Sequence, residues 1–140
     1  MKPQSKSIAF IHKDSCVACG CCLKICPRQA LDIWKGSYAI VSHDLCVGCG
    51  KCLSVCPGNL LKKGEDGKVH IRNIRDCWGC TACLKECHTG AILYFLGADM
   101  GGMGSMLSVK EKGDVRIWRV DSPDGETKTI EINMKDSNKY

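Results

Sequence analysis

The sequence predicts an α+β protein in which a cysteine-rich domain is followed by a small antiparallel β-meander. Two observations carry this prediction. A Cys-x2-Cys-x2-Cys-x3-Cys pattern occurs three times before residue 88, and no cysteine follows it. The rest of the chain holds three short apolar stretches separated by turn-forming residues, which is typical of antiparallel strands. We therefore expect two parts, residues 1–96 with the cysteine motifs and residues 97–140 with the meander.

The cysteine motifs form an internal repeat. Motif one is Cys16, Cys19, Cys22 and Cys26; motif two is Cys46, Cys49, Cys52 and Cys56; motif three is Cys77, Cys80, Cys83 and Cys87. The first cysteines of the motifs are 30 and then 31 residues apart. Each unit is expected to contain a cysteine loop, a short helical turn around the fourth cysteine, and a hairpin strand.

The strands expected in the cysteine-rich part follow the repeat. Residues 7–12 are apolar and predict a first strand, and residues 31–34 and 38–41 alternate around a glycine turn as a hairpin. Unit two predicts a hairpin from residues 60–61 and 69–71 around the polar turn 64–67, and unit three ends in a strand at 91–95.

Beyond residue 96 the composition changes. Residues 97–106 are rich in glycine and methionine without periodicity, which predicts an irregular loop. Strands are expected at 106–110, 115–120 and 127–132. An isolated meander is only marginally stable, so its apolar face, assigned to Val115, Ile117 and either Val120 or Trp118, needs a partner surface. We expect this meander and the Gly/Met loop to dock a partner.

The cysteine usage indicates a reduced protein that binds metal clusters. Thirteen cysteines is an odd number, which does not suit a disulfide framework, and no signal segment opens the chain. The longest apolar run, residues 91–96, is too short to span a bilayer. We therefore expect a cytoplasmic location and no membrane association.

The spacing of the cysteines favours [4Fe–4S] clusters over zinc. Three cysteines in Cys-x2-Cys-x2-Cys place three sulfurs around one cluster, and the fourth cysteine of such a run ligates a neighbouring cluster in two-cluster ferredoxins. Zinc prefers two Cys-x2-Cys pairs separated by a longer loop. The twelve motif cysteines therefore predict three [4Fe–4S] clusters.

The net charge of +5 does not indicate nucleic-acid binding, because it counts the cysteines as neutral. Each cluster with four thiolates carries a charge of about −2, so three clusters bring the net charge to about −1. The basic residues are scattered and form no arginine-rich run. We expect no nucleic-acid partner.

Residues 13–61 resemble a bacterial 2[4Fe–4S] ferredoxin, including a Cys-Pro-x-x-Ala-Leu run from Cys26 to Leu31. The resemblance implies a ferredoxin-like fold in which Cys56 completes the motif-one cluster and Cys26 completes the motif-two cluster. In the competing scheme, motif two exchanges its fourth cysteine with motif three. The spacing does not choose between them, because Cys26 to Cys46 is 20 residues and Cys56 to Cys77 is 21. Cys21, the thirteenth cysteine, is expected to face away from the cluster.

A second resemblance covers motif two to the end of the chain. It rests on Cys-Pro-Gly-Asn-Leu-Leu from Cys56, Asp-Cys-Trp-Gly-Cys-Thr-Ala-Cys-Leu-Lys-Glu-Cys from Asp76, Gly-Ala-Ile from Gly90, the segment 98–104 and the strand 115–120. These segments resemble the iron–sulfur β subunit of adenylylsulfate (APS) reductase. The resemblance implies a soluble electron donor such as a ferredoxin, and an FAD-containing α subunit in an assembly of two α and two β chains. That α subunit reduces APS to sulfite.

In that family a tryptophan after the first cysteine of one motif lies between a cluster and the flavin, and Trp78 matches this position. The resemblance thus implies that Trp78 lies on the path of electrons to the flavin. No catalytic residue is expected in this chain, which would be the electron-transfer subunit of the complex.

The chain also departs from the family. It has three regular motifs instead of two clusters with an irregular first motif, His88 replaces a proline, and the tail after Ile132 is short. These departures allow a relative that acts on the 3′-phosphorylated substrate (PAPS). The alternatives are a polyferredoxin-type subunit of another anaerobic oxidoreductase, or a free-standing ferredoxin.

Overall fold

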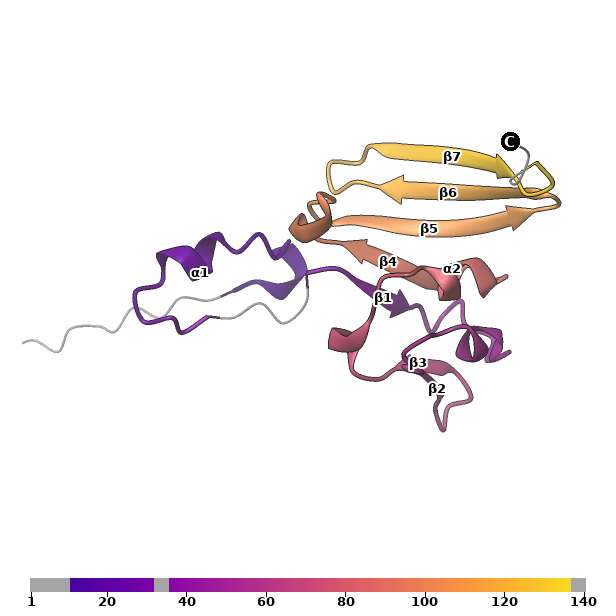
Figure 1. Ribbon diagram of the computed structural model, residues 1–140, viewed down its shortest axis with the longest axis horizontal. Helices are drawn as coiled ribbons and strands as arrows, with labels where there is room; N and C mark the ends of the chain where they lie inside the picture. Colours follow the sequence, from indigo (N-terminus) through magenta and orange to yellow (C-terminus); the bar gives the residue numbers. More distant parts are fainter. Residues whose placement is uncertain (1–10, 32–35, 137–140) are drawn as a thin grey trace, which may run out of the picture.

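The computed structural model describes residues 11–31 and 36–136. Its main element is a five-stranded antiparallel sheet in the order β1-β4-β5-β6-β7, accompanied by the two-stranded hairpin β2-β3 (Figure 1). The strands are β1 (Tyr38–Val41), β2 (Leu61–Lys63), β3 (Val69–Ile71), β4 (Ile92–Leu96), β5 (Ser105–Lys112), β6 (Val115–Asp121) and β7 (Thr127–Asn133).

The helices are few and short. The α-helices are α1 (Cys21–Ile25) and α2 (Ala82–Glu86), and the 3-10 turns are η1 (Lys13–Ser15), η2 (Lys51–Ser54), η3 (Ile74–Asp76) and η4 (Ala98–Met100). In each motif the helical turn ends before the fourth cysteine, whereas the sequence predicted a turn around it. Within the described ranges, no helix has the length and apolar character needed to cross a membrane.

The strands of the C-terminal part continue a sheet that begins in the cysteine-rich part. β1 pairs with β4 through Val41 and Ile92, and β4 pairs with β5 through Phe95 and Met106. The segment 31–34, expected as the hairpin partner of β1, lies almost wholly outside the described residues, as does most of the strand expected at 7–12. Residues 1–96 and 97–140 thus share one sheet, and their division into two domains stays a prediction.

The apolar face assigned to the meander needs correction. Side chains alternate between the two faces of a strand, so Val115 and Ile117 in β6 face one side while Trp118 and Val120 face the other. Trp118 is paired with Val109 of β5, which is buried, and it packs against the core. The face that covers the core therefore carries Trp118 and Val120, and the predicted set mixed the two faces.

The core lies between this sheet face and the cysteine loops. Its buried side chains come from both sheets, from α2 and from the turn η2: Ala39, Cys52, Leu61, Val69, Leu84, Ile92, Tyr94 and Val109. Leu84 is the only buried residue of α2 and belongs to the core, and α2 lies beside β4 (Figure 1). Burial of such apolar side chains stabilises the fold by about 2 kcal/mol each.

The Gly/Met loop after β4 is held by specific hydrogen bonds rather than being irregular throughout. Ser37 Oγ accepts a hydrogen bond from the Gly97 backbone N–H at 2.9 Å and donates one to Asp99 Oδ1 at 2.5 Å. The backbone N–H of Ala98 donates to the carbonyl oxygen of Val17 at 2.9 Å. This loop therefore joins the start of β1 to the segment of motif one, which projects from one end of the molecule (Figure 1).

Candidate iron–sulfur centres

The three cysteine motifs share one backbone conformation. Three positions in each motif have positive φ, a conformation that favours glycine. These positions are Ala18, Gly48 and Gly79 in the loop, Gly20, Gly50 and Thr81 before the helical turn, and Gln29, Asn59 and Gly90 after the fourth cysteine. Motif one thus folds like the other two, although it lies apart from them and has non-glycine residues at two of the three positions.

The fourth cysteine of each motif accepts the same backbone hydrogen bond. The sulfur of Cys26 accepts the N–H of Ala30 at 3.5 Å, Cys56 that of Leu60 at 3.4 Å, and Cys87 that of Ala91 at 3.3 Å. These bonds help to lower the pKa of the Cys26 and Cys87 thiols, which favours the thiolate that binds iron. The three fourth cysteines thus share one hydrogen-bond arrangement.

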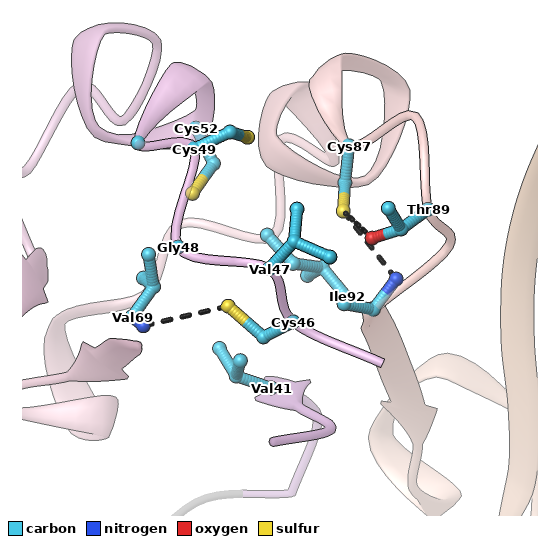
Figure 2. A pocket seen from close by; sticks show the side chains of 12 residues that line it. Val41, Cys46, Val47, Gly48, Cys49, Cys52, Val69, Cys87, Thr89 and Ile92 are labelled. Carbon is cyan, nitrogen blue, oxygen red and sulfur yellow. Dashed lines mark hydrogen bonds between the residues drawn. The ribbon is translucent and has the colours of Figure 1, made fainter. Parts of the chain in front are cut away.

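The first group of cysteines joins motif two to the end of motif three. Cys46, Cys49, Cys52 and Cys87 line one cavity together with Val41, Gly48 and Val69 (Figure 2). The backbone N–H of Val69 donates to Cys46 Sγ at 3.5 Å. The Thr89 hydroxyl lies 3.4 Å from Cys87 Sγ. Four sulfurs around one cavity, with donors aimed at two of them, suit a [4Fe–4S] cluster.

The second group joins motif three to the end of motif two. Cys83 lies close enough to Cys77, Cys80 and Cys56 for their charges to act on its thiol. The charges of Cys77, Cys80 and Cys83 also act on the phenol of Tyr94 in β4. The structure thus groups the cysteines by the competing scheme, in which Cys56 and Cys87 are exchanged. The sets implied by the resemblance of residues 13–61 to a two-cluster ferredoxin are not the ones that the fold brings together.

Burial controls the protonation of these thiols. It raises the pKa of Cys52 to about 11 and that of Cys83 to about 12, and neighbouring cysteines add to both shifts. Burial also acts on Cys87, but hydrogen bonds from Thr89 and the N–H of Ala91 outweigh it and hold the pKa of Cys87 below its ordinary value. Iron must therefore displace protons from Cys52 and Cys83 when it binds.

The grouping of the sulfurs suits a cubane cluster. Two sets of four cysteines each draw three from one motif and the fourth from a neighbouring motif, which is the ligand pattern of two-cluster ferredoxins. Such a cluster supplies reversible one-electron transfer when bound.

Motif one is the exposed member of the repeat. Cys16, Cys19 and Cys22 are exposed and Cys26 is half-buried. Because the other two groups already contain Cys56 and Cys87, a cluster at motif one has only the cysteines of its own segment within this chain. Cys21 is exposed, and hydrogen bonds from its backbone and side chain lower the pKa of the Cys19 thiol; its orientation away from the cluster stays a prediction.

The two residues that distinguish motif three are both at the surface. Trp78 follows Cys77 directly and 75% of its surface is exposed. His88 is also exposed. The role of Trp78 as a route to a flavin stays a prediction, but its position leaves the indole free to contact a partner.

Sequence reasoning missed the residues that support the sulfurs from other segments. Val69 comes from β3, and no local pattern links it to Cys46. Thr89 and Tyr94 both follow motif three closely. Of these two, only Thr89 could have been predicted to contact a sulfur, because it is a polar residue two positions after the fourth cysteine.

Comparison with known proteins agrees with this geometry. Two family models described as 4Fe-4S dicluster domains match residues 9–63 and residues 45–91. The two matches overlap at motif two, so one covers motifs one and two and the other covers motifs two and three. No curated protein sequence matches the chain.

A solved structure shares the fold. It is described as adenosine 5'-phosphosulfate reductase in complex with substrate, and one of its chains superposes with a TM-score of 0.57 at 24% identity over 67% of each chain. This likeness agrees with the resemblance found in motifs two and three. The chain is therefore an iron–sulfur protein that is similar to 4Fe-4S dicluster domains over residues 9–63 and 45–91 and shares its fold with a chain of adenosine 5'-phosphosulfate reductase.

Proposed function

We propose that the chain is the electron-transfer subunit of a sulfur-metabolising oxidoreductase. In this proposal three [4Fe–4S] clusters receive electrons from a soluble donor such as a ferredoxin and deliver them singly to an FAD-containing partner, which reduces APS or PAPS to sulfite. The observation that carries the proposal is the shared fold with a chain of adenosine 5'-phosphosulfate reductase over two thirds of the molecule. The exposed Trp78 beside Cys77 supports it.

The twelve motif cysteines are the proposed ligands, in three sets. The first set is Cys46, Cys49, Cys52 and Cys87; the second is Cys77, Cys80, Cys83 and Cys56; the third is Cys16, Cys19, Cys22 and Cys26. The chain's residues hold the sulfurs, donate hydrogen bonds to them and partly cover the first two sets, in which Cys49 and Cys80 are exposed. We propose that the chain itself converts no substrate.

An open apolar strip offers a docking surface for the partner. It lies on the core-side face of β5, β6 and β7, beyond the part that the cysteine loops cover. Its apolar side chains are Leu107, Trp118, Val120, Ile130 and Ile132. Ile130 is 65% exposed, which is unusual for a large apolar side chain unless a second surface covers it. Met100 and Met103 of the Gly/Met loop are exposed as well.

The test is co-purification followed by assay. The tagged chain, produced anaerobically in its native host, should bring down a stoichiometric flavoprotein that contains FAD. The complex should reduce APS or PAPS when a reduced electron donor is supplied. Assays with each nucleotide alone identify which of the two is the substrate. A chain that stays monomeric and binds no flavoprotein contradicts the proposal.

Motif one favours a second candidate, a polyferredoxin-type subunit of another anaerobic oxidoreductase. Motif one repeats the backbone of the other motifs in a segment set apart from them, as an added electron-transfer unit would be. A co-purified flavoprotein that reduces neither nucleotide, or a partner without flavin, would favour this candidate.

A further inference from the structure

Two imidazoles and a carboxylate gather beside motif two, outside the cysteine groups. They belong to His43, in the segment between β1 and motif two, and to Asp66 and His70 of the β2-β3 hairpin. One ligand atom from each lies within 4.8 Å of the other two. None of these residues was singled out by the cysteine repeat.

The two members of the group that come from the hairpin, Asp66 and His70, already contact each other. His70 Nε2 lies 3.0 Å from both carboxylate oxygens of Asp66. Both side chains pack over Gly64, where a Cβ atom would come within 2.7 Å of His70 Nε2 and 2.8 Å of Asp66 Oδ1. The glycine in the hairpin turn therefore lets the imidazole and the carboxylate converge.

The orientation of His43 also suits a metal ligand. Its Nε2 lies 3.2 Å from the carbonyl oxygen of Val69, so the N–H on that nitrogen donates to the carbonyl. In the neutral tautomer with this hydrogen bond, Nδ1 carries the lone pair that a cation requires. Histidines that bind metals usually hold the ring this way, with the second N–H donated to a carbonyl or carboxylate. Lys68 Nζ donates to the backbone carbonyl of His43 and leaves the ring free.

An ion pair between Asp66 and His70 does not explain why His43 lies beside them. Such a pair is exposed, with side chains 46% and 43% accessible, and contributes little stability. The His43 ring lies 4.3 Å from the His70 ring between centroids, at an interplanar angle of 60°. A shared cation bound by neutral imidazoles and one carboxylate accounts for all three positions.

The donor set identifies the class of cation. Imidazole nitrogen suits zinc and the later divalent transition metals, and calcium and magnesium require mainly oxygen ligands. Ligand atoms in a tetrahedral zinc site with bonds of about 2.1 Å are about 3.4 Å apart, close to the 3.0 Å between His70 Nε2 and Asp66.

We propose that His43, Asp66 and His70 bind one divalent transition-metal ion of the zinc type, with water completing the coordination. The ion would tie the hairpin to the segment that leads into motif two. The two already touch at other points, since Val69 donates to Cys46 Sγ and the carbonyl oxygen of Gly67 lies where a Cβ atom of Gly48 would be. Metal binding is expected to stabilise this contact.

The test uses the anaerobically purified full chain with its iron in place. Zn²⁺ is added, loosely held metal is removed with a weak chelator, and zinc and iron are counted by elemental analysis. We expect about one zinc per chain above the level retained by the double variant His43→Gln/His70→Gln, with iron content unchanged. Zinc should also raise the Tm of the native chain and leave that of the double variant unchanged.

Two further variants keep the result interpretable. Asp66→Asn keeps the shape of the side chain and should retain at least tenfold less zinc in the same assay, because a neutral amide is a weaker ligand. His12→Gln removes a histidine from the segment of motif one, which is remote from the hairpin, and should retain zinc like the native chain (Figure 1). Equal zinc in the double variant, or zinc gained only as iron is lost, would overturn the proposal.

Discussion

The phenolic oxygen of Tyr94 lies directly over Gly79, where a Cβ atom would come within 2.5 Å of it. Gly79 sits in the loop of motif three between Cys77 and Cys80, and Tyr94 is buried in β4. The sheet thus packs closely against the loop that carries the second group of cysteines. The absence of a side chain at residue 79 permits the contact, as does its positive φ of 72°.

Replacement of Gly79 by alanine should therefore destabilise the chain. Gly101→Ala is a matched control, because Gly101 has the same φ of 72° and no atom near its Cβ position. Both variants carry the backbone strain of about 1 kcal/mol, and only Gly79→Ala adds a clash, for a further loss of about 2 kcal/mol. The check is the Tm of both variants with their iron content. Equal Tm values would show that the Tyr94 contact is unimportant.

The exchange of fourth cysteines predicts which cluster each variant loses. Cys87→Ser should remove the iron held with Cys46, Cys49 and Cys52, because Cys87 lines the same cavity. Cys26→Ser should affect motif one and leave motif two intact. EPR spectra of the reduced variants, compared with iron content, separate the two effects. A loss of the motif-two signal in Cys26→Ser would instead support the pairing of motifs one and two.

The buried thiols predict a dependence on pH in the iron-free chain. The pKa of Cys83 is raised to about 12 and that of Cys52 to about 11, so both stay protonated at pH 8. The pKa of Cys19 is lowered, chiefly by hydrogen bonds from Cys21. Because only the thiolate reacts, alkylation at pH 8 should modify Cys83 about 1,000-fold more slowly than an ordinary exposed cysteine.

Mass spectrometry of the alkylated peptides measures these rates. Raising the pH above 8 should speed modification of Cys83 by a larger factor than that of Cys19, because the pKa of Cys83 is raised to about 12 whereas that of Cys19 is lowered. The same experiment in denaturant is the control, because unfolding removes the burial that raises the pKa. Similar rates for Cys19 and Cys83 in the folded chain would contradict the burial argument.

Replacement of Trp78 by alanine tests the proposed exit for electrons. The side chain is exposed, so its removal should leave Tm and iron content close to those of the native chain. In the complex with the flavoprotein, reduction of the flavin should slow at least tenfold, because the indole no longer fills the path between the two cofactors. Stopped-flow flavin absorbance is the measurement.

Trp118→Ala is the matched control, because it removes a tryptophan from the apolar strip of the sheet instead. This variant should weaken docking and raise the concentration of flavoprotein needed, without changing the rate once the complex is saturated. An unchanged rate for Trp78→Ala at saturation would assign Trp78 to packing alone.

The local features of the cluster loops could be predicted from the sequence. The ligand candidates follow from spacing, because Cys-x2-Cys-x2-Cys constrains one loop and its three sulfurs together. Strands β1 to β7 lie at or close to their expected positions for the same reason, since alternation and turn residues act over a few neighbours. The face of β6 was misassigned because alternation shows that two faces exist, and only packing shows which one meets the core.

The partner of each fourth cysteine depended on the tertiary structure. Cys26 and Cys56 precede the next motif by nearly equal lengths of chain, so local geometry treats them alike. The pairing of β1 with β4 distinguishes the two cysteines. A hydrogen bond of 2.7 Å from the Ser42 N–H to the Ala91 carbonyl extends this pairing. Ser42 lies four residues before Cys46, and Ala91 lies four residues after Cys87. The same long-range contact that closes the sheet thus brings the start of motif two to the end of motif three.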